Sequence, residues 1–144
     1  MQSLCHHDLE PIFVPNSLPR RRGAVAVIER DQRLLVIRRS EFVSAPLKYC
    51  FPGGRLEPGE TAERAVVREL REELQLDIRP VVILWRNITP WNVELTWWSV
   101  HVDGEAEPIP NPAEVHSVHW FSPHELRSLV GLLDSNLEFL RHWF

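Results

Sequence analysis

Short apolar runs rich in β-branched residues are separated by polar turns along most of this chain of 144 residues. Runs of this kind, bounded by turn residues, predict β-strands. Residues 23–29 and 33–39 form two such runs around a polar turn, so we expect a β-hairpin there. Three later runs, VVILW, VELTWWSVHV and VHWF, predict further strands, and the proline-rich EPIPNP between the last two predicts a loop.

The apolar pattern changes to a helical period after the glycine-rich and proline-rich stretch FPGGRLEPGE. Thr61 is a suitable N-cap for a helix that begins there. The apolar positions after it recur at the spacing of a buried helical face, and they are Ala62, Ala65, Val66, Leu70 and Leu74. A central helix is therefore predicted among the strands.

Two further helices are expected near the C-terminal end. Ser122 and Glu125 stand in the order of a capping box, with Pro123 at the first helical position. A last helix is predicted from about residue 135 onward, and its expected buried residues are Leu137, Leu140 and Phe144. Strands with one central helix and helices at the end predict an α/β fold, an α/β/α sandwich with a mixed β-sheet.

Length and composition fit a single domain. At 144 residues, 44% of them hydrophobic, the chain can bury one core. Residues 1–22 carry three prolines and little periodicity, so we expect an extended N-terminal arm, followed by one domain over residues 23–144. The arginines at its end, Arg20, Arg21 and Arg22, are expected to be a solvated charge run in preference to a phosphate clamp. A homodimer is one possible assembly.

Charge and cysteine content narrow the function classes. The net charge of −4 disfavours a stable nucleic-acid complex, since such binding uses a broad basic surface to neutralise phosphates. Two cysteines, Cys5 and Cys50, cannot make a disulfide framework, so a reducing cytoplasm is the expected setting. No apolar run approaches the roughly 20 residues of a membrane span, and no membrane association is expected. Small ligands remain open.

Three carboxylates, Glu69, Glu72 and Glu73, crowd within two turns of the predicted central helix. At about 100° per residue they fall in an arc beside the buried stripe. Like charges at this spacing repel by roughly 0.2–0.5 kcal/mol per pair, and a bound cation would offset the repulsion. The alternative is a solvated helix whose charges pair internally, for example Arg68 with Glu72.

The residues before the helix favour the metal site. Gly53 and Gly54 let the backbone approach a ligand closely and offer a carbonyl as a further oxygen ligand. A solvated helix gives no reason for this glycine pair or for Glu60 after it. Hard oxygen ligands of this kind suit Mg²⁺, with Mn²⁺ as the other option, and do not suit zinc.

The stretch from Gly54 to Leu76 resembles the signature of the Nudix (MutT-like) hydrolase family. Gly54 is followed after five residues by Glu60, and after seven more by RELREELQL. This order matches the family's box at every defined position except Gln75, where the family usually has glycine. FPGG before the box and EVHSVHW near the C-terminus extend the resemblance over most of residues 23–130.

Gln75 stands where the helix is expected to end. Glycine serves at such a position because it tolerates the left-handed conformation. Glutamine would either take that conformation at a cost of roughly 1 kcal/mol or end the helix differently. We expect a local cost in stability and no loss of metal binding, because every ligand position of the resemblance is intact.

The resemblance implies Mg²⁺-dependent hydrolysis of a nucleoside diphosphate linked to another moiety, by water attack at phosphorus. The substrate would be a small nucleotide such as a nucleoside triphosphate, ADP-ribose or a nucleotide sugar. By match to the family, the metal ions are held by the carbonyl of Gly53 and by the carboxylates of Glu69, Glu72 and Glu73.

The resemblance also suggests roles for residues around these ligands. Arg68 would orient the glutamates by ion pairing, and Glu60 would support the start of the helix. The general base stays open between Glu73 and Glu114; MutT-like members carry a glutamate near the place of Glu114 that binds metal or activates water. The alternative for Glu114 is an exposed loop acid. Arg39 resembles an arginine that contacts substrate, and its alternative is a solvated strand end.

Two other functions share the fold that the resemblance implies. One is a non-catalytic module that senses a nucleotide, and the other is an isomerase acting on isopentenyl diphosphate. The intact glutamates argue against the first, and the intact box without a suitably placed second cysteine argues against the second. Trp85, Trp91, Trp97 and Trp98 could stack on a base. Trp97 and Trp98 must face opposite sides of one strand, so at most one of that pair reaches the pocket.

Overall fold

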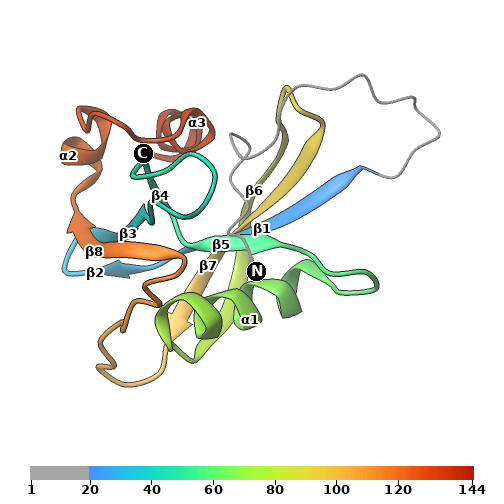
Figure 1. The fold of residues 1–144 in the computed structure, drawn as a ribbon, viewed down its shortest axis with the longest axis horizontal. Helices are drawn as coiled ribbons and strands as arrows, with labels where there is room; N and C mark the ends of the chain where they lie inside the picture. The colour runs from blue at the N-terminus through green and yellow to red at the C-terminus, as the bar shows by residue number, and fades with distance from the viewer. Residues whose placement is uncertain (1–19) are drawn as a thin grey trace.

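The computed structural model describes residues 20–144, which form two four-stranded sheets and three helices (Figure 1). Most of the predicted arm and Cys5 therefore lie outside the described residues. The first strand begins at Arg21, within the range predicted for the arm. The elements are β1 (Arg21–Val27), β2 (Glu29–Arg30), β3 (Arg33–Arg39), β4 (Tyr49–Cys50), β5 (Gly53–Arg55), α1 (Ala62–Leu74), β6 (Ile78–Ile88), β7 (Val93–Val102), β8 (Val115–Phe121), α2 (Pro123–Arg127) and α3 (Asp134–Trp143).

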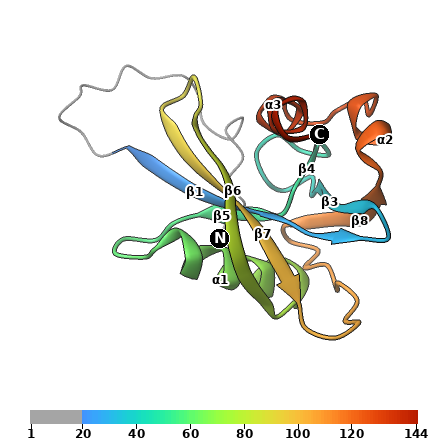
Figure 2. The same cartoon turned by 180° about the vertical axis from the view of Figure 1, so that it is seen from behind.

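The strands divide between two sheets. The first, sheet A, has the order β5-β1-β7-β6, in which β1 runs parallel to β7 while the other pairs are antiparallel. The second, sheet B, has the order β2-β3-β4, with β8 antiparallel on β3. Sheet B lies beside sheet A in both views (Figures 1 and 2). The mixed sheet is as predicted, and the division into two sheets was not foreseen.

The predicted hairpin is present, but its first strand is shorter than expected. Asp31 and Gln32 both take positive φ, 53° and 63°, and join β2 to β3 through a two-residue turn. The apolar run before the turn belongs mainly to β1, which pairs with β5 and β7 in sheet A. One apolar run thus links the two sheets, because the chain changes partner strands at Ile28.

Local signals set the helix starts as predicted. Thr61 caps α1, since its hydroxyl accepts from the N–H of Arg64 at 3.2 Å. Ser122 and Glu125 form both bonds of a capping box at α2, at 2.9 and 3.1 Å. Among residues 20–144, no helix combines the length and apolar character that a membrane crossing requires.

Helices α1 and α3 cover opposite faces of sheet A. Val66 of α1 belongs to the same buried cluster as Ala24 of β1. Phe139 of α3 shares a second cluster with Val25 and Trp97. Because Ala24 and Val25 are neighbours on one strand, these clusters lie on its two sides. The architecture is the predicted α/β/α sandwich.

The predicted buried face of the last helix needs correction. Leu140 is buried, but Leu137 is only partly buried and Phe144 is 41% exposed. Phe139 takes the central place, with its ring stacked 4.6 Å from that of Trp97. At about 100° per residue, the buried residues Ser135, Asn136, Phe139 and Leu140 fall within an arc of about 140°, and Leu137 lies about 60° outside it.

Candidate active site

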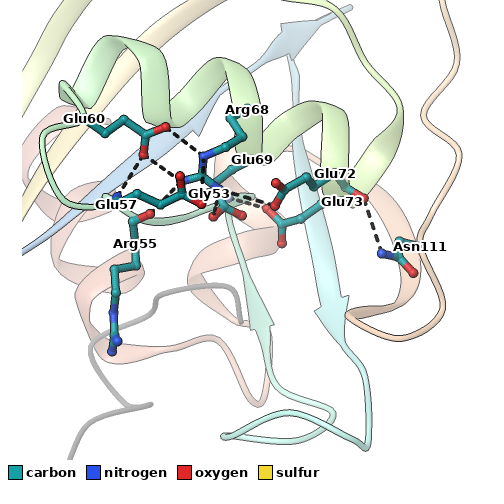
Figure 3. A network of polar contacts seen from close by, with 9 residues as sticks. All are labelled: Gly53, Arg55, Glu57, Glu60, Arg68, Glu69, Glu72, Glu73 and Asn111. Atoms are coloured by element: carbon teal, nitrogen blue, oxygen red, sulfur yellow. Dashed lines mark hydrogen bonds and ion pairs between the residues drawn. The ribbon is translucent and has the colours of Figure 1, made fainter. Parts of the chain in front are cut away.

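Helix α1 places two of its three carboxylates inside the protein. Glu69 and Glu73 are fully buried, whereas the side chain of Glu72 is 37% exposed. Glu69 and Glu73 lie one turn apart on the side of α1 that faces β5 (Figure 3). The predicted position at the edge of the buried stripe therefore holds for Glu72, while the other two lie deeper than expected.

Two glycines of β5 allow the helix to come this close. A Cβ atom on Gly54 would lie 2.3 Å from the carboxyl carbon of Glu69, and one on Gly53 would lie 2.2 Å from the carbonyl oxygen of Ala24. The backbone N–H of Gly53 donates to Oε1 of Glu73 at 2.9 Å. A Cβ atom at Gly54 would push β5 away from Glu69 of α1, and one at Gly53 would collide with the backbone of β1, so the glycine pair is a packing requirement of the acidic site.

Arg68 joins the acidic residues into one network (Figure 3). Its guanidinium makes two hydrogen bonds of 2.8 Å to the carboxylate of Glu60. One terminal nitrogen is also 2.9 Å from Oε1 of Glu69 and 3.3 Å from Oε2 of Glu72. The other donates to the carbonyl oxygen of Arg55 at 2.8 Å. The pair of Arg68 with Glu72, predicted as the alternative to a metal site, is thus present as the longest of these contacts.

The charges of this network are unevenly balanced. The hydrogen bonds from Arg68 hold the pKa of Glu60 below its usual value, and they raise the pKa of Arg68. Burial raises the pKa of Glu69 to about 8 although Arg68 opposes this shift. Repulsion from Glu72 and Glu114 adds to the rise, so the structure brings these two carboxylates near Glu69.

One oxygen of Glu69 lacks compensation. Oε2 of Glu69 is buried and makes no hydrogen bond within residues 20–144. A buried carboxylate oxygen in this position is costly, and a divalent cation would supply the missing positive charge. Within the same residues, no three acidic, histidine or cysteine side chains are already gathered around one point. Binding one ion through all three glutamates therefore requires side-chain rotation, which the exposed Glu72 permits.

Glu114 and Arg39 occupy buried positions beside the acidic helix. Glu114 is 6% exposed and burial raises its pKa, so the alternative of an exposed loop acid is wrong. Arg39 is fully buried, and its Nε donates to the carbonyl oxygen of Ser44 at 2.9 Å. The alternative of a solvated strand end is wrong as well. Arg39 pairs with Val115 at the irregular end of the β3–β8 ladder, which puts it next to Glu114.

The tryptophans divide between the two faces of sheet A as predicted. Trp97 is fully buried on the α3 side, and Trp98 packs against the cluster on the α1 side. Trp85 borders a hollow of about 530 Å³ together with residues of α3, and its ring stacks on that of His142 with centroids 4.9 Å apart. Trp85 is therefore a candidate for stacking on a base, which the sequence did not single out.

Gln75 ends α1 in the left-handed conformation, with φ 52° and ψ 33°. Its N–H donates to the carbonyl oxygen of Arg71 at 3.0 Å. Of the two outcomes predicted for Gln75, the structure therefore shows glutamine in the conformation that glycine adopts freely, at a cost of about 1 kcal/mol. The helix ends at Leu74, so the acidic residues keep their places on it.

Of the arginines at the start of β1, Arg20 and Arg22 are exposed, as predicted for a solvated charge run. Arg20, Arg21 and Arg22 line a pocket of about 300 Å³ together with Arg55. Arg21 is only partly exposed. Sequence reasoning missed Arg55, although its place directly after the glycine pair was a usable signal.

Comparison with known proteins agrees with the signature in the sequence. A family model described as "NUDIX domain" matches residues 19–143. Two relatives, from Pseudomonas entomophila and Stutzerimonas stutzeri, are each named "NAD-capped RNA hydrolase NudC" and are 31% and 32% identical over 107 residues. Each match covers 73% of this chain and 37% of the relative, so the chain spans little more than a third of the length of these relatives.

Solved structures show the same fold. A MutT NUDIX hydrolase from Burkholderia pseudomallei is similar with a TM-score of 0.72 and 27% identity, covering 86% of this chain and 98% of that one. A MutT protein from Methanosarcina mazei Go1 has a TM-score of 0.76 and 22% identity, covering 89% and 95%, and this likeness supports the fold alone. The resemblance carried by Gly54 to Leu76 is confirmed, and the chain belongs to the Nudix hydrolase family.

Proposed function

We propose that this protein is a Mg²⁺-dependent pyrophosphohydrolase, which cleaves a phosphoanhydride bond of a nucleoside diphosphate linked to another moiety by water attack at phosphorus. One observation carries the proposal. Glu69 is fully buried with one oxygen lacking a hydrogen bond in residues 20–144, beside Glu72, Glu73 and Glu114. Such an arrangement is costly without a cation and stable with one.

The donor set fits a hard divalent ion. Carboxylates of Glu69, Glu72 and Glu73, with the carbonyl of Gly53, would hold it, and all of these donors are oxygens. When bound, Mg²⁺ neutralises the charge of the phosphoanhydride and lowers the pKa of the attacking water. Mn²⁺ would serve the same donors.

The surrounding residues keep these donors in place. Arg68 holds Glu69 and Glu72 by ion pairs, and its two bonds to Glu60 fix its own orientation. The N–H of Gly53 orients Glu73 from β5. Arg68 is thus a positioning residue, and Glu60 supports it at the start of α1.

Two residues are candidates for the general base, which takes a proton from the attacking water. Glu73 is hydrogen bonded by the N–H of Gly53, and burial raises the pKa of Glu114. A carboxylate with a raised pKa is a stronger base once it is deprotonated. Comparing the pH–rate profiles of Glu73→Gln and Glu114→Gln separates the two, because removing the base removes the acidic limb of the profile.

The substrate is proposed to be a small nucleotide, and Arg39 is proposed to contact it. The names of the NudC relatives add NAD-like dinucleotides to nucleoside triphosphates, ADP-ribose and nucleotide sugars as substrates to be tested. The same names leave open whether a capped RNA is accepted, although the net charge of −4 disfavours a stable nucleic-acid complex. A homodimer in a cytoplasmic setting stays a prediction, and light scattering on the purified chain tests the assembly.

Mass spectrometry of reaction products tests the proposed function. The protein is incubated with Mg²⁺ and these nucleotides in ¹⁸O-labelled water, and the label is located in the products. We expect cleavage of one class with one labelled phosphate, and no cleavage after removal of metal by EDTA. Binding of a nucleotide by thermal shift without cleavage of any would contradict the proposal and favour the sensing module.

A further inference from the structure

A pocket of about 300 Å³ at the edge of sheet A is lined by four arginines and by the segment that leads into α1. Its arginines come from two places in the sequence, Arg20 to Arg22 and Arg55. Strand β5 is an edge strand, and its pairing of Arg55 with Gly23 of β1 brings the two groups together. We name this space the arginine pocket.

The arginine pocket carries excess positive charge. Its two carboxylates, Glu57 and Glu60, form ion pairs with Arg68, which does not line the pocket; the N–O distances are 3.8 and 2.8 Å. Arg20 has a loose partner, Glu94, at 3.6 Å.

The other three arginines of the pocket, Arg21, Arg22 and Arg55, have no ion pair with a carboxylate within residues 20–144. A terminal nitrogen of Arg21 is buried there and makes no hydrogen bond with the described part of the chain. Arg21 and Arg22 are neighbours on β1 and their side chains leave it on opposite sides, so the pocket does not bring all three guanidinium groups together. Cationic side chains beside one pocket still repel one another unless an anion lies between them.

Phosphate is the anion that fits these groups best. The planar guanidinium donates two parallel hydrogen bonds to phosphate oxygens, and arginine is favoured wherever such paired recognition occurs. The volume of about 300 Å³ is at the low end for ligand pockets, so it suits a phosphate group with part of a sugar and not a whole dinucleotide.

The arginine pocket lies within reach of the acidic site. Arg55 follows Gly53 by two residues on an extended strand, which is about 7 Å along the backbone. Glu60 lines both the arginine pocket and a hollow of about 750 Å³ that also contains Arg68 and Glu72. Figure 3 shows the side chain of Arg55 directed away from α1, so its guanidinium is not part of the acidic network. The arginine pocket and the acidic site therefore adjoin at Glu60, which Arg68 links to Glu69 and Glu72.

We propose that the arginine pocket binds a second phosphate of the substrate, one that is not cleaved and that is carried on the ribose of the nucleoside diphosphate. This inference rests on the proposed function, because it assumes that the phosphoanhydride bond lies at the acidic site. The second phosphate is either a terminal monoester or the first diester of a nucleotide chain, and both present the same oxygens to arginine.

Three matched compounds test the inference: ADP-ribose, ADP-ribose 2′-phosphate, and ADP-ribose extended by one nucleotide through a 3′-phosphodiester. With Mg²⁺, we expect kcat/KM to be about tenfold higher for at least one phosphorylated compound, since a hydrogen bond between charged groups is stronger than one between neutral groups. The favoured compound identifies the source as monoester or diester. Equal kcat/KM values for all three would overturn the inference.

Variants test whether the pocket causes the preference. The measured quantity is the ratio of kcat/KM for the phosphorylated compound to kcat/KM for ADP-ribose. Arg55→Ala is expected to lower this ratio by about tenfold, and Arg55→Lys by less, because lysine loses the paired hydrogen bonds but keeps the charge. Arg79→Ala, which removes an exposed arginine of β6 outside the pocket, is the control and leaves the ratio unchanged. A ratio that Arg55→Ala does not change would overturn the inference.

A binding measurement separates this inference from the proposed function. If none of the three compounds is hydrolysed, calorimetry with AMP and adenosine 2′,5′-bisphosphate decides the pocket by itself, and the proposed function fails only if no other nucleotide of the panel is hydrolysed either. Neither nucleotide has a phosphoanhydride bond, so Mg²⁺ can be present. Tighter binding of the bisphosphate that Arg55→Ala abolishes supports the arginine pocket, and equal binding of the two overturns it.

Discussion

Helices α1 and α3 each cover one face of sheet A, but their buried surfaces differ. The buried side of α3 carries no charge: it combines Phe139, which is stacked on Trp97, and Leu140 with the neutral polar Ser135 and Asn136. The buried side of α1 is aliphatic on one half only, and its other half carries Glu69 and Glu73 at 0% exposure. Both helices cover one face of the same sheet, but only α1 buries charge.

The difference shows which helix serves stability and which serves chemistry. Burying an aromatic ring contributes to folding outright, whereas burying a carboxylate costs free energy unless a cation or an arginine compensates it. Arg68 compensates one oxygen of Glu69 and leaves the other without a hydrogen bond in the described chain. A protein keeps such an arrangement where function requires it. Changes in α1 should therefore alter activity, and changes in α3 should alter stability.

The largest expected effect is on turnover in α1. Glu73→Gln should lower kcat by about 10²-fold or more, because it removes a proposed ligand or base while keeping the shape of the side chain. Steady-state kinetics measure the loss, and circular dichroism checks that the fold is kept. Glu63→Gln, at an exposed position of the same helix, is the matched control. Near-normal turnover in Glu73→Gln would remove Glu73 from the site.

The counterpart in α3 is a loss of stability. Phe139→Ala should lower the free energy of unfolding by about 3–5 kcal/mol, because it empties the centre of the second cluster. Urea denaturation measures the change. The exposed Glu138→Ala on the same helix should change stability little. A loss below about 1 kcal/mol for Phe139→Ala would show that α3 is not the stabilising helix.

The buried charge of α1 predicts how stability depends on pH. The pKa of Glu69 rises from 4.5 to about 8 on folding, so the folded state holds this proton more tightly. The contribution of Glu69 to the stability of the metal-free protein is therefore greatest below pH 4.5, and it is lost as the pH rises through about 8.

Thermal unfolding in EDTA between pH 5 and 9 measures this slope. Glu69→Gln should make it shallower but not flat, because the raised pKa of Glu114 acts in the same direction. Mg²⁺ should restore stability at high pH in the parent protein and much less in the variant. An identical slope in parent and variant would contradict the assignment to Glu69.

The smallest expected effect concerns the end of α1. Gln75→Gly should stabilise the protein by about 1 kcal/mol, because glycine takes the left-handed conformation without the steric cost that glutamine bears. Turnover should stay unchanged, since the acidic residues precede the helix end. Gln75→Ala keeps a Cβ atom and should give little of this gain. Equal stability of the glycine and alanine variants would show that the left-handed conformation is not strained.

Much of the local structure was predictable because its causes are local. The caps at Thr61 and Ser122 depend on bonds within three residues, and the helix and strand periods follow from side-chain alternation. The acidic motif was predictable for the same reason, since its spacing places the glutamates on one side of a single helix.

Other features depended on contacts between distant segments. The arginine pocket needed the pairing of Arg55 with Gly23, which joins segments 32 residues apart. The burial of Arg39 and Glu114 needed the β3–β8 ladder. The apolar run of residues 23–29 is divided between the two sheets, and its periodicity could not show this, because strands of both sheets have the same alternation of side chains.

The sequence by itself determined the family, the single acidic helix and the hard-oxygen character of its donors. Only the tertiary structure decided how deeply Glu69 and Glu73 are buried, and it also gathered Arg20, Arg21 and Arg22 around Arg55. Spacing along a chain fixes which side of a helix a carboxylate occupies. The second sheet, strand pairing and neighbouring charges fix its exposure, its pKa and its partners, and these are set by residues far away in the sequence.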